Sequence, residues 1–401
     1  MQPEQRVIVV GAGPAGIASA VALKDAGLGP VVVDQADRIA SSWRSRYDSL
    51  RLNTWRPFSH LPGRRFPKGT PTFPSRDQLV DHLERHAAED GIELRLGTRV
   101  ERIDRADGEW VISSSAGELR SSQVIVATGH EQTPVIPDWP GRETFEGELL
   151  HTSEYRNPGP FEGKRVLVVG PGCSGMEIAK ELAEGGASEV WLAVRTPPNL
   201  LLRQGPGPVP GDLIGTLLWH LPTRMGDRIA RFGARMDFGD LAEYGLPRPE
   251  TGVFTDVRTR GKVPAIVDAE VIEAIKEGRI EVVAAVASLD SSKVDLADGT
   301  RIEPESVICA TGYRRALEPL LGHLGVLGDR GLPRTIGHRS AAPGLRFIGF
   351  LPRPGGIGHM GKEARCAAKV IRRELRQRGG ERWPLRPTDS HQSSAAGSTT
   401  R

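Results

Sequence analysis

The sequence predicts an α/β protein with two Rossmann-like dinucleotide-binding domains, the second of which is inserted into the first. Two glycine-rich turns, at residues 11–16 and 170–175, support this prediction, because each follows an apolar run and precedes a helical pattern. Two further apolar runs, at residues 124–130 and 306–313, also reach a glycine and are typical of strands buried in a parallel sheet. A chain of 401 residues is long enough for two domains with separate cores.

The first turn belongs to a complete βαβ unit. Residues 6–10 read as a buried strand, residues 17–26 as a small-residue helix, and residues 30–34 as a second strand that closes on Asp34. A glycine turn between strand and helix lets the backbone approach a pyrophosphate, whose charge then lies on free N–H groups of the helix. Asp34 can accept hydrogen bonds from a ribose diol, which indicates FAD or NAD.

The second turn is followed by a different residue type. Its second strand, at residues 189–196, ends on Arg195, at the place that Asp34 holds in the first unit. A guanidinium there attracts a 2′-phosphate and indicates NADPH over NADH, although an ordinary surface arginine is the alternative. Cys173 lies in this turn, where a helix N-terminus lowers a thiol pKa, but without a partner cysteine we expect a packing role.

The least regular stretch, at residues 197–262, is rich in glycine and proline and contains two apolar-basic helical segments, near 213–221 and 224–236. Three roles are consistent with these two helices: they line a substrate tunnel, they touch a membrane surface, or they pack at the edge of a core. Elsewhere we expect a serine-capped helix at 74–91 and a C-terminal helix that begins near His359.

These patterns predict a division of the chain into four parts. We expect the first part of the FAD-binding domain at 1–155, the NADPH-binding domain at 156–300 with the helical insert 197–262, the second part of the FAD-binding domain at 301–386, and a disordered tail at 387–401.

Composition narrows the class of protein. The 53 basic and 50 acidic residues leave a net charge of +3, which does not favour a nucleic-acid partner. The three cysteines, Cys173, Cys309 and Cys366, form no CxxC pair, so neither a disulfide framework nor a redox dithiol is predicted. We see no leader peptide and no apolar run of the roughly 18–20 residues that a membrane span needs. A cytoplasmic protein without stable membrane insertion is therefore expected, and no metal site is predicted.

A spaced motif before the second turn carries a family resemblance. Phe145, Gly147, His151 and Tyr155 match the FxGxxxHxxxY motif that identifies flavin-containing monooxygenases. The turn at 170–175 resembles the NADPH turn of that family, residues 310–313 (ATGY) its late motif, and residues 127–129 (ATG) its linker to the FAD domain. The resemblance covers residues 5 to about 378 and is greatest to plant YUCCA-type indole-3-pyruvate monooxygenases and their bacterial relatives. Residues 39–43, 47–53, 58–63 and 245–252 contribute to it.

The resemblance implies an activity. NADPH reduces FAD, O2 adds at flavin C4a to form a (hydro)peroxide, and one oxygen atom enters a small organic substrate. The reaction is either oxidative decarboxylation of an aryl 2-oxo acid or N- or S-oxygenation. Asn53 lies where many members place an asparagine that faces flavin and NADP⁺, whereas YUCCA-type sequences often have histidine there. Its alternative role is to satisfy a local turn.

Other motif residues have both a binding and a structural interpretation. His151 and Tyr155 are tied in the family to the interdomain linker and NADP(H), but a histidine here also serves to hold backbone in place. The helix near His359 would direct its positive end at reduced flavin. The turns and the resemblance together assign cofactor binding to Gly11, Gly13, Pro14, Ala15, Gly16, Asp34, Gln35, Trp43, Arg44, Leu52, Val100, Ala127, Thr128, Gly129, His151, Tyr155, Gly170, Gly172, Cys173, Ser174, Gly175, Arg195, Ala310, Thr311, Gly312, Tyr313 and Gly349, and a catalytic role to Asn53.

Three other classes of function stay open. A Baeyer–Villiger monooxygenase is one, although that group typically has tryptophan in place of Tyr155. An NAD(P)H-dependent flavin reductase without oxygenation is another, and the missing CxxC argues against its disulfide type. A non-catalytic nucleotide-binding flavoprotein is the third. The partners expected are the organic substrate, O2 and a second copy of the chain in a homodimer.

Overall fold

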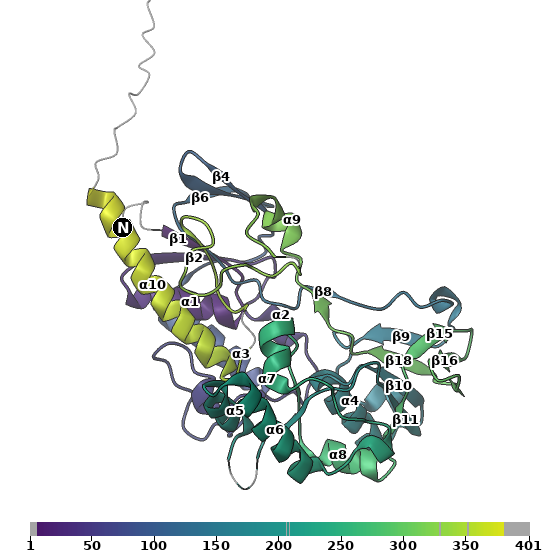
Figure 1. Ribbon diagram of the computed structural model, residues 1–401. Coiled ribbons are helices and arrows are strands. Elements are labelled where there is room, and N and C mark those ends of the chain that lie inside the picture. Colours follow the sequence, from purple (N-terminus) through teal and green to yellow (C-terminus); the bar gives the residue numbers. More distant parts are fainter. Residues whose placement is uncertain (1–5, 206, 208, 329, 351–352, 381–401) are drawn as a thin grey trace, which may run out of the picture.

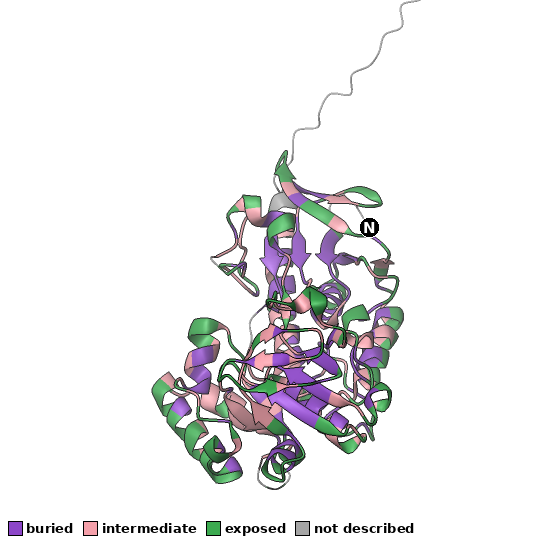
Figure 2. Ribbon diagram, turned by 90° about the vertical axis from the view of Figure 1, so that its right-hand side faces the viewer, coloured by how far each residue is buried: buried purple, intermediate pink, exposed green. Residues whose placement is uncertain are grey.

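A computed structural model describes residues 6–205, 207, 209–328, 330–350 and 353–380 of the chain. The predicted tail at 387–401 lies outside the described residues. The chain forms two lobes, each built on a five-stranded parallel sheet (Figure 1). Buried strands occupy the centre of each lobe, and the exposed faces of helices lie outside them (Figure 2). The predicted α/β class is confirmed.

The first sheet joins the two ends of the chain. Its order is β20-β7-β1-β2-β3. Its strands are β1 (Arg6–Val10), β2 (Gly29–Val33), β3 (Glu93–Arg95), β7 (Val124–Val126) and β20 (Leu345–Phe347). Because β20 comes from the C-terminal part and pairs with β7, the chain between them is inserted into this lobe, as predicted.

Helices and a meander cover the two faces of the first sheet. Residues of α1 (Pro14–Asp25), α3 (Arg76–Glu89) and α10 (Gly356–Gly380) share one core with β1 and β2. Alanine and glycine predominate in α1, which lets the long helix α10 pack close beside it (Figure 1). The predicted serine cap of α3 is confirmed as a capping box between Ser75 and Gln78. The opposite face packs against the antiparallel meander β4 (Val100–Ala106), β5 (Glu109–Ser114) and β6 (Gly117–Ser121), and against α9 (Glu318–Leu321).

The second sheet has the order β14-β11-β10-β18-β9. Its strands are β9 (Glu148–His151), β10 (Arg165–Val169), β11 (Glu189–Ala193), β14 (Glu281–Val283) and β18 (Ser306–Cys309). On one face lie α4 (Cys173–Glu184) and α8 (Ala269–Lys276). On the other lies the antiparallel sheet of β15 (Val286–Leu289), β16 (Val294–Leu296) and β17 (Arg301–Ile302).

The predicted domain boundaries at 155/156 and 300/301 do not coincide with the sheets. Strand β9 precedes the first boundary and β18 follows the second, yet both pair within the second sheet, Ser306 opposite Glu148 and Cys309 opposite His151. Pairing between strands so distant in the chain leaves no local sequence signal. The short antiparallel pair of β8 (Thr133–Pro134) and β19 (Tyr313–Arg314) then joins the lobes.

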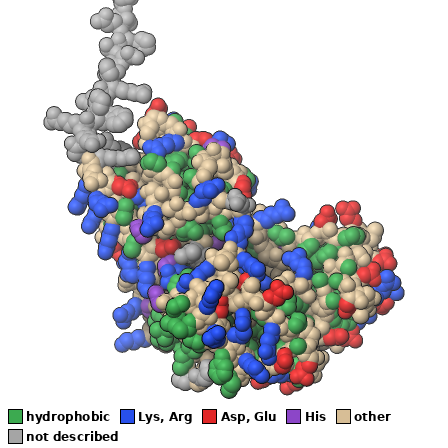
Figure 3. Space-filling model, viewed as in Figure 1, with side chains coloured by type: hydrophobic (Ala, Val, Ile, Leu, Met, Phe, Trp, Pro, Cys, Tyr) green, Lys and Arg blue, Asp and Glu red, His purple; other side chains and the backbone are tan. Residues whose placement is uncertain are grey.

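The insert contains the two predicted helices, α5 (Gly211–Trp219) and α6 (Thr223–Phe238). It also contains α7 (Val253–Thr255), a π-helical turn at Asp256–Arg260 and β12 (Leu200–Leu202), which we did not predict. Strand β12 pairs in parallel with β13 (Ala265–Val267), just beyond the insert. Large exposed apolar side chains gather on the outer faces of α5 and α6, including Leu217, Phe232 and Met236 (Figure 3). No helix in the described part of the chain is both long and apolar enough to cross a membrane.

Candidate functional site

The first glycine-rich turn is closely packed except at one position. A Cβ on Gly11, whose φ is +110°, would lie 2.6 Å from the Ala127 carbonyl oxygen, and one on Gly16 would lie 1.7 Å from the Gly11 oxygen. A Cβ on Gly13 would meet nothing within 4 Å. The turn therefore needs glycine twice for its own packing, whereas Gly13, with Pro14 and Ala15 after it, is open to a ligand from outside.

The second turn repeats this arrangement position by position. A Cβ on Gly170 (φ +111°) would lie 2.7 Å from the Ala310 oxygen, and one on Gly175 would lie 1.9 Å from the Gly170 oxygen, while Gly172 faces open space. Ala127 and Ala310, the first residues of the two ATG motifs, thus support the two turns in the same way. Residues of both motifs that were predicted to bind cofactors are therefore brought to the turns by the sheets.

The strand ends differ by one residue from our prediction. Val10 pairs with Val33 in the first unit and Val169 with Ala193 in the second, so the residue that matches Asp34 is Val194. Arg195 matches Gln35 instead, and the predicted equivalence with Asp34 was wrong because both strands were assumed to end at the same place. Arg195 still lines a cavity of about 610 Å³ at this edge of the sheet.

Asp34 closes the first turn. Its Oδ2 accepts a hydrogen bond from the Ala12 N–H at 2.6 Å and its Oδ1 one from the Ala36 N–H at 2.8 Å. The Thr98 N–H donates to the Asp34 carbonyl at 2.8 Å, which places Val100, the first residue of β4, two positions beyond this contact. A carboxylate oxygen has further lone pairs, so Asp34 can also accept from a ribose.

The loop between the lobes brings Asn53 against the second turn. Burial raises the pKa of the Cys173 thiol, and Asn53 is among the neighbouring groups that oppose this rise. Two buried oxygen atoms have no hydrogen-bond partner among the described residues. They are Oδ1 of Asn53 and Oγ1 of Thr128, a residue of the first ATG motif. Two such buried polar atoms beside the turns fit an additional group between the lobes.

The residues before Asn53 support the loop. Leu52 is buried in the first core, and Trp43 packs against that core from α2 (Ser41–Arg44). The Arg44 side chain forms an ion pair with Glu84 and donates to the Ile39 carbonyl. Contact of Trp43, Arg44 and Leu52 with a cofactor stays a prediction.

The polar atoms of His151 and Tyr155 are occupied by the protein itself. His151 is fully buried, its Nε2 lies 3.0 Å from the Gly312 carbonyl oxygen, and its ring meets the Tyr313 ring edge-on at 4.7 Å. Burial lowers the pKa of His151, so the ring is neutral and suited to hold this backbone. The Tyr155 hydroxyl donates to Glu181 of α4 at 3.1 Å, and burial raises its pKa. The geometry favours the structural interpretation of both residues, and their contact with NADP(H) stays a prediction.

A buried network beside the second turn was missed by sequence reasoning. The Tyr47 hydroxyl and the Arg203 guanidinium both donate to the Glu177 carboxylate of α4. Arg203 also forms an ion pair with Asp268 at 3.3 Å, and burial raises the pKa of Tyr47. The one available signal was Glu177 itself, an acid on the apolar face of α4 next to Met176 and Ile178. The network ties the loop that carries Asn53 to the helix after the second turn.

Cys173 and the C-terminal helix both depart from simple expectation. The Cys173 sulfur accepts from the Ile266 N–H at 3.3 Å, and burial raises rather than lowers its thiol pKa, which agrees with a packing role. Helix α10 begins at Gly356, three residues before His359, near which we predicted its start. A Cβ on Gly358 would lie 2.5 Å from the Phe58 oxygen, and one on Gly349 would lie 2.7 Å from the Ala15 Cβ, so both positions require glycine.

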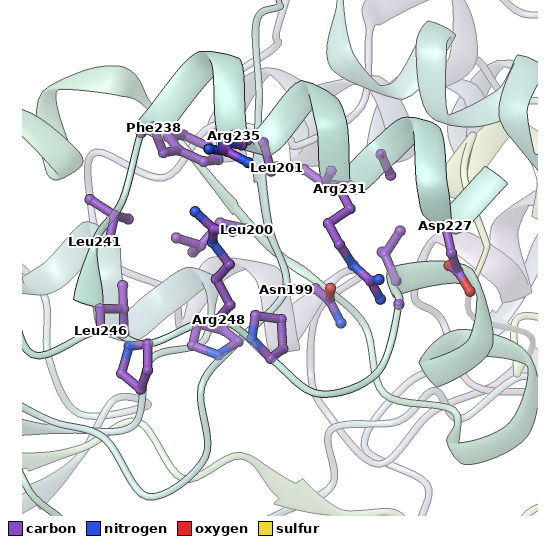
Figure 4. Close-up of a pocket in the computed structure, with 18 residues that line it drawn as sticks. Asn199, Leu200, Leu201, Asp227, Arg231, Arg235, Phe238, Leu241, Leu246 and Arg248 are labelled. Carbon is purple, nitrogen blue, oxygen red and sulfur yellow. The ribbon is translucent and has the colours of Figure 1, made fainter. Parts of the chain in front are cut away.

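A separate small cavity lies under α6 (Figure 4). Leu200, Phe238 and Leu246 form its apolar part, and Arg231 and Arg248 point along its opening. Its volume of about 90 Å³ is smaller than small-molecule sites require, and neither glycine-rich turn contributes to it.

The similarities of this chain to known proteins extend over both glycine-rich turns. A family model for pyridine nucleotide-disulphide oxidoreductases matches residues 8–199. The indole-3-pyruvate monooxygenase YUCCA1 of Oryza sativa subsp. japonica is 36% identical to this chain, and the alignment covers 92% of each sequence. The probable indole-3-pyruvate monooxygenase YUCCA3 of Arabidopsis thaliana is 34% identical and covers 86% of this chain and 81% of that protein.

Solved structures share the fold. A flavin-containing monooxygenase from Stenotrophomonas maltophilia has a TM-score of 0.67 at 21% identity, over 92% of this chain and 98% of that chain. The OTEMO complex with FAD and NADP has a TM-score of 0.70 at 18% identity, over 94% and 87% of the two chains. Since these likenesses extend over both lobes and the YUCCA1 match spans almost the whole of both sequences, the chain belongs to the flavin-containing monooxygenase family.

Proposed function

We propose that the protein is an FAD- and NADPH-dependent monooxygenase that acts on an aryl 2-oxo acid. FAD occupies the turn at residues 11–16 and NADPH the turn at residues 170–175. The substrate class is supported by relatives named as indole-3-pyruvate monooxygenases over most of this chain. N- or S-oxygenation of a soft nucleophile stays the alternative reaction.

The observation that carries this proposal is the pair of matching turns with one unsatisfied amide beside them. Each turn has a single open glycine, Gly13 or Gly172, through which a pyrophosphate can approach backbone N–H groups. Asn53 comes from the loop of the first lobe and lies near enough to Cys173 of the second to lower the pKa of its thiol. Two dinucleotides held at these turns extend toward each other across this residue.

When bound, the flavin supplies the transfer of electrons from NADPH to O2, so the protein provides position, dryness and few polar groups. The reaction proposed is 2-oxo acid, O2, NADPH and H⁺ giving carboxylic acid, CO2, NADP⁺ and H2O. Asn53 presents a free carbonyl oxygen that can accept a hydrogen bond from a cofactor, and its NH2 group can donate to a reacting oxygen. The Tyr47–Glu177–Arg203 network holds the loop of Asn53 against α4 and excludes water from that side.

The test is oxygen-dependent turnover by the FAD-loaded protein. We expect phenylpyruvate or indole-3-pyruvate to yield close to one equivalent of the shortened acid per NADPH consumed. NADPH consumption that yields only hydrogen peroxide with oxo acids, amines and thioethers alike would favour a reductase instead. Replacing Asn53 by Ala should raise the share of NADPH lost to peroxide without removing FAD, and unchanged coupling would assign Asn53 to the local turn.

We also infer a cytoplasmic homodimer that binds neither nucleic acid nor a membrane by insertion. The balanced charge supports the lack of a nucleic-acid partner, and the absence of a CxxC pair in the sequence supports a reducing compartment. The homodimer is an expectation that needs its own measurement. Light scattering of the purified protein tests the dimer, and a monomer at micromolar concentration would contradict it.

A further inference from the structure

A basic cavity lies between the loop after Asn53, the end of α5 and the first turns of α10. Its volume of about 580 Å³ is within the range of small-molecule sites. Its wall carries five cationic side chains and three histidines, and none of the described residues that line it is Asp or Glu. The cations are Arg64, Arg65, Arg353, Lys362 and Arg365. Arg64 is already paired with Asp25 and Asp90, so among the described residues of the wall the free positive charge comes from the other four. Figure 3 shows how Lys and Arg side chains follow the edge of the molecule formed by α10.

Two hydrogen-bond donors in this wall lack a partner. The Arg353 Nε and the Thr216 Oγ1 are buried and make no hydrogen bond with any described residue. The buried His359 Nε2 has a neighbour, because it lies 3.4 Å from Glu363 Oε1. A buried polar group without a partner is costly, so the two donors indicate a missing acceptor.

The surroundings of the Arg353 guanidinium also indicate that the cavity binds an anion. Its guanidinium carbon lies 5.4 Å from the centroid of the Trp219 ring, and Arg258 lies 4.6 Å from the same ring. Burial lowers the pKa of Arg353, Glu363 raises it and Arg258 lowers it. Trp219 and Arg258 lie outside the cavity wall, and Glu363 offsets part of the repulsion between the two cations. An anion bound beside Arg353 in the cavity would stabilise its charged form further.

The remaining wall is apolar and borders the loop of Asn53. Pro57, Phe58 and Leu61 line the cavity, which favours an anion attached to a ring over a bare phosphate. A Cβ on Gly356 would lie 2.8 Å from the Thr54 side chain, so the first turn of α10 packs directly on the residue that follows Asn53. The cavity therefore lies next to the segment proposed to face the cofactors.

We propose that this cavity binds the carboxylate of an aromatic organic-acid substrate, with Arg353 as the specificity-determining contact and Thr216 as a second donor. A guanidinium accommodates a carboxylate through two parallel hydrogen bonds, which a neutral amine or thioether cannot accept. The inference rests on the proposed function for the identity of the substrate. In this proposal Arg353 and Thr216, which lie outside both glycine-rich turns, determine whether an acid or a neutral substrate is preferred.

Binding without turnover is the first test. Phenylacetate and phenylacetamide have the same ring and differ in charge, and calorimetry with the oxidised, FAD-loaded protein measures the affinity for each. We expect the wild type to prefer the acid, and Arg353→Gln to weaken phenylacetate about tenfold or more while leaving phenylacetamide unchanged. Arg353→Lys should restore part of the preference, and Thr216→Val should reduce it by less. The control is Arg376→Gln, an exposed residue of α10 outside the cavity.

Turnover separates this inference from the proposed function. Arg353→Gln should raise KM for phenylpyruvate about tenfold or more with little change in kcat. NADPH oxidation without substrate should stay at the wild-type rate. If the wild type binds phenylacetate through Arg353 but oxidises no oxo acid, the proposed function fails and the cavity stands. If it oxidises oxo acids and Arg353→Gln alters neither KM nor the acid-to-amide preference, the cavity proposal is overturned. An equal loss of affinity for phenylacetate and phenylacetamide in Arg353→Gln would also overturn the cavity proposal.

Discussion

Replacing Gly172 by Ala separates the role of a turn in folding from its role in binding. Gly172 has φ −77° and ψ 179°, an extended conformation that alanine adopts freely, and its added Cβ would meet nothing within 4 Å. We therefore expect the fold to be unharmed and the free energy of unfolding to change by less than about 1 kcal/mol, because alanine restricts the unfolded chain more than glycine does but is a poorer N-cap for α4.

The affinity for NADPH, unlike the fold, should be harmed by Gly172→Ala. A methyl group at the open position lies where a pyrophosphate reaches the backbone N–H groups. Loss of one charge-assisted hydrogen bond costs about 1.5–3 kcal/mol, which corresponds to about 10- to 100-fold weaker binding of NADPH. FAD, which the other turn holds, should be retained. Gly13→Ala is the matched variant and should instead lower FAD retention.

Gly175→Ala provides the contrast. Its Cβ would lie 1.9 Å from the Gly170 oxygen, closer than the 3.0 Å below which such contacts essentially do not occur, so backbone must move. Overpacking of this kind costs about 1–3 kcal/mol, and the melting temperature should fall. The assay combines thermal unfolding with NADPH titration of the FAD-loaded variants. Wild-type affinity for NADPH in a folded Gly172→Ala protein would refute the assignment of the second turn.

Three further predictions follow from individual side chains. Arg195→Ala should weaken NADPH about tenfold and NADH hardly at all, as measured by steady-state KM values, and equal effects would remove the 2′-phosphate assignment. Arg203→Ala leaves Glu177 buried without its cation and should lower the free energy of unfolding in urea by about 3–5 kcal/mol, whereas the exposed Arg120→Ala should change it little; similar values for both would contradict a buried ion pair. Burial lowers the pKa of His82 from its ordinary 6.5 to about 3, so unfolded chains bind the extra proton and stability should fall as pH drops from 6.5 toward 3. His82→Leu should make that decline shallower, and an unchanged pH profile would show that His82 is not its source.

Local signals were sufficient for both turns and most helices. Each turn is a contiguous run with a strand before it and a helix after it, so its geometry depends on residues close in sequence. The Ser75 cap of α3 was readable for the same reason. By contrast, the glycines at the start of α10 have weak helix propensity, so the sequence indicated a later start than Gly356, where the helix begins.

Long-range pairing accounts for what could not be predicted. Membership of β9 and β18 in the second sheet depends on strands more than 150 residues apart. The Tyr47–Glu177 contact spans 130 residues, and no local pattern around either residue indicates its partner. The one-residue offset of Arg195 depends on where β11 ends in the register, which the apolar run EVWLAV does not reveal.

The most direct measurement is an anaerobic titration of the FAD-loaded protein with NADPH, followed by its visible spectrum. If two dinucleotides meet across Asn53, NADPH should bleach the yellow colour stoichiometrically, and admitting oxygen should restore it. A protein that takes up no FAD, or that binds FAD and stays yellow with excess NADPH, would contradict the arrangement of the two turns.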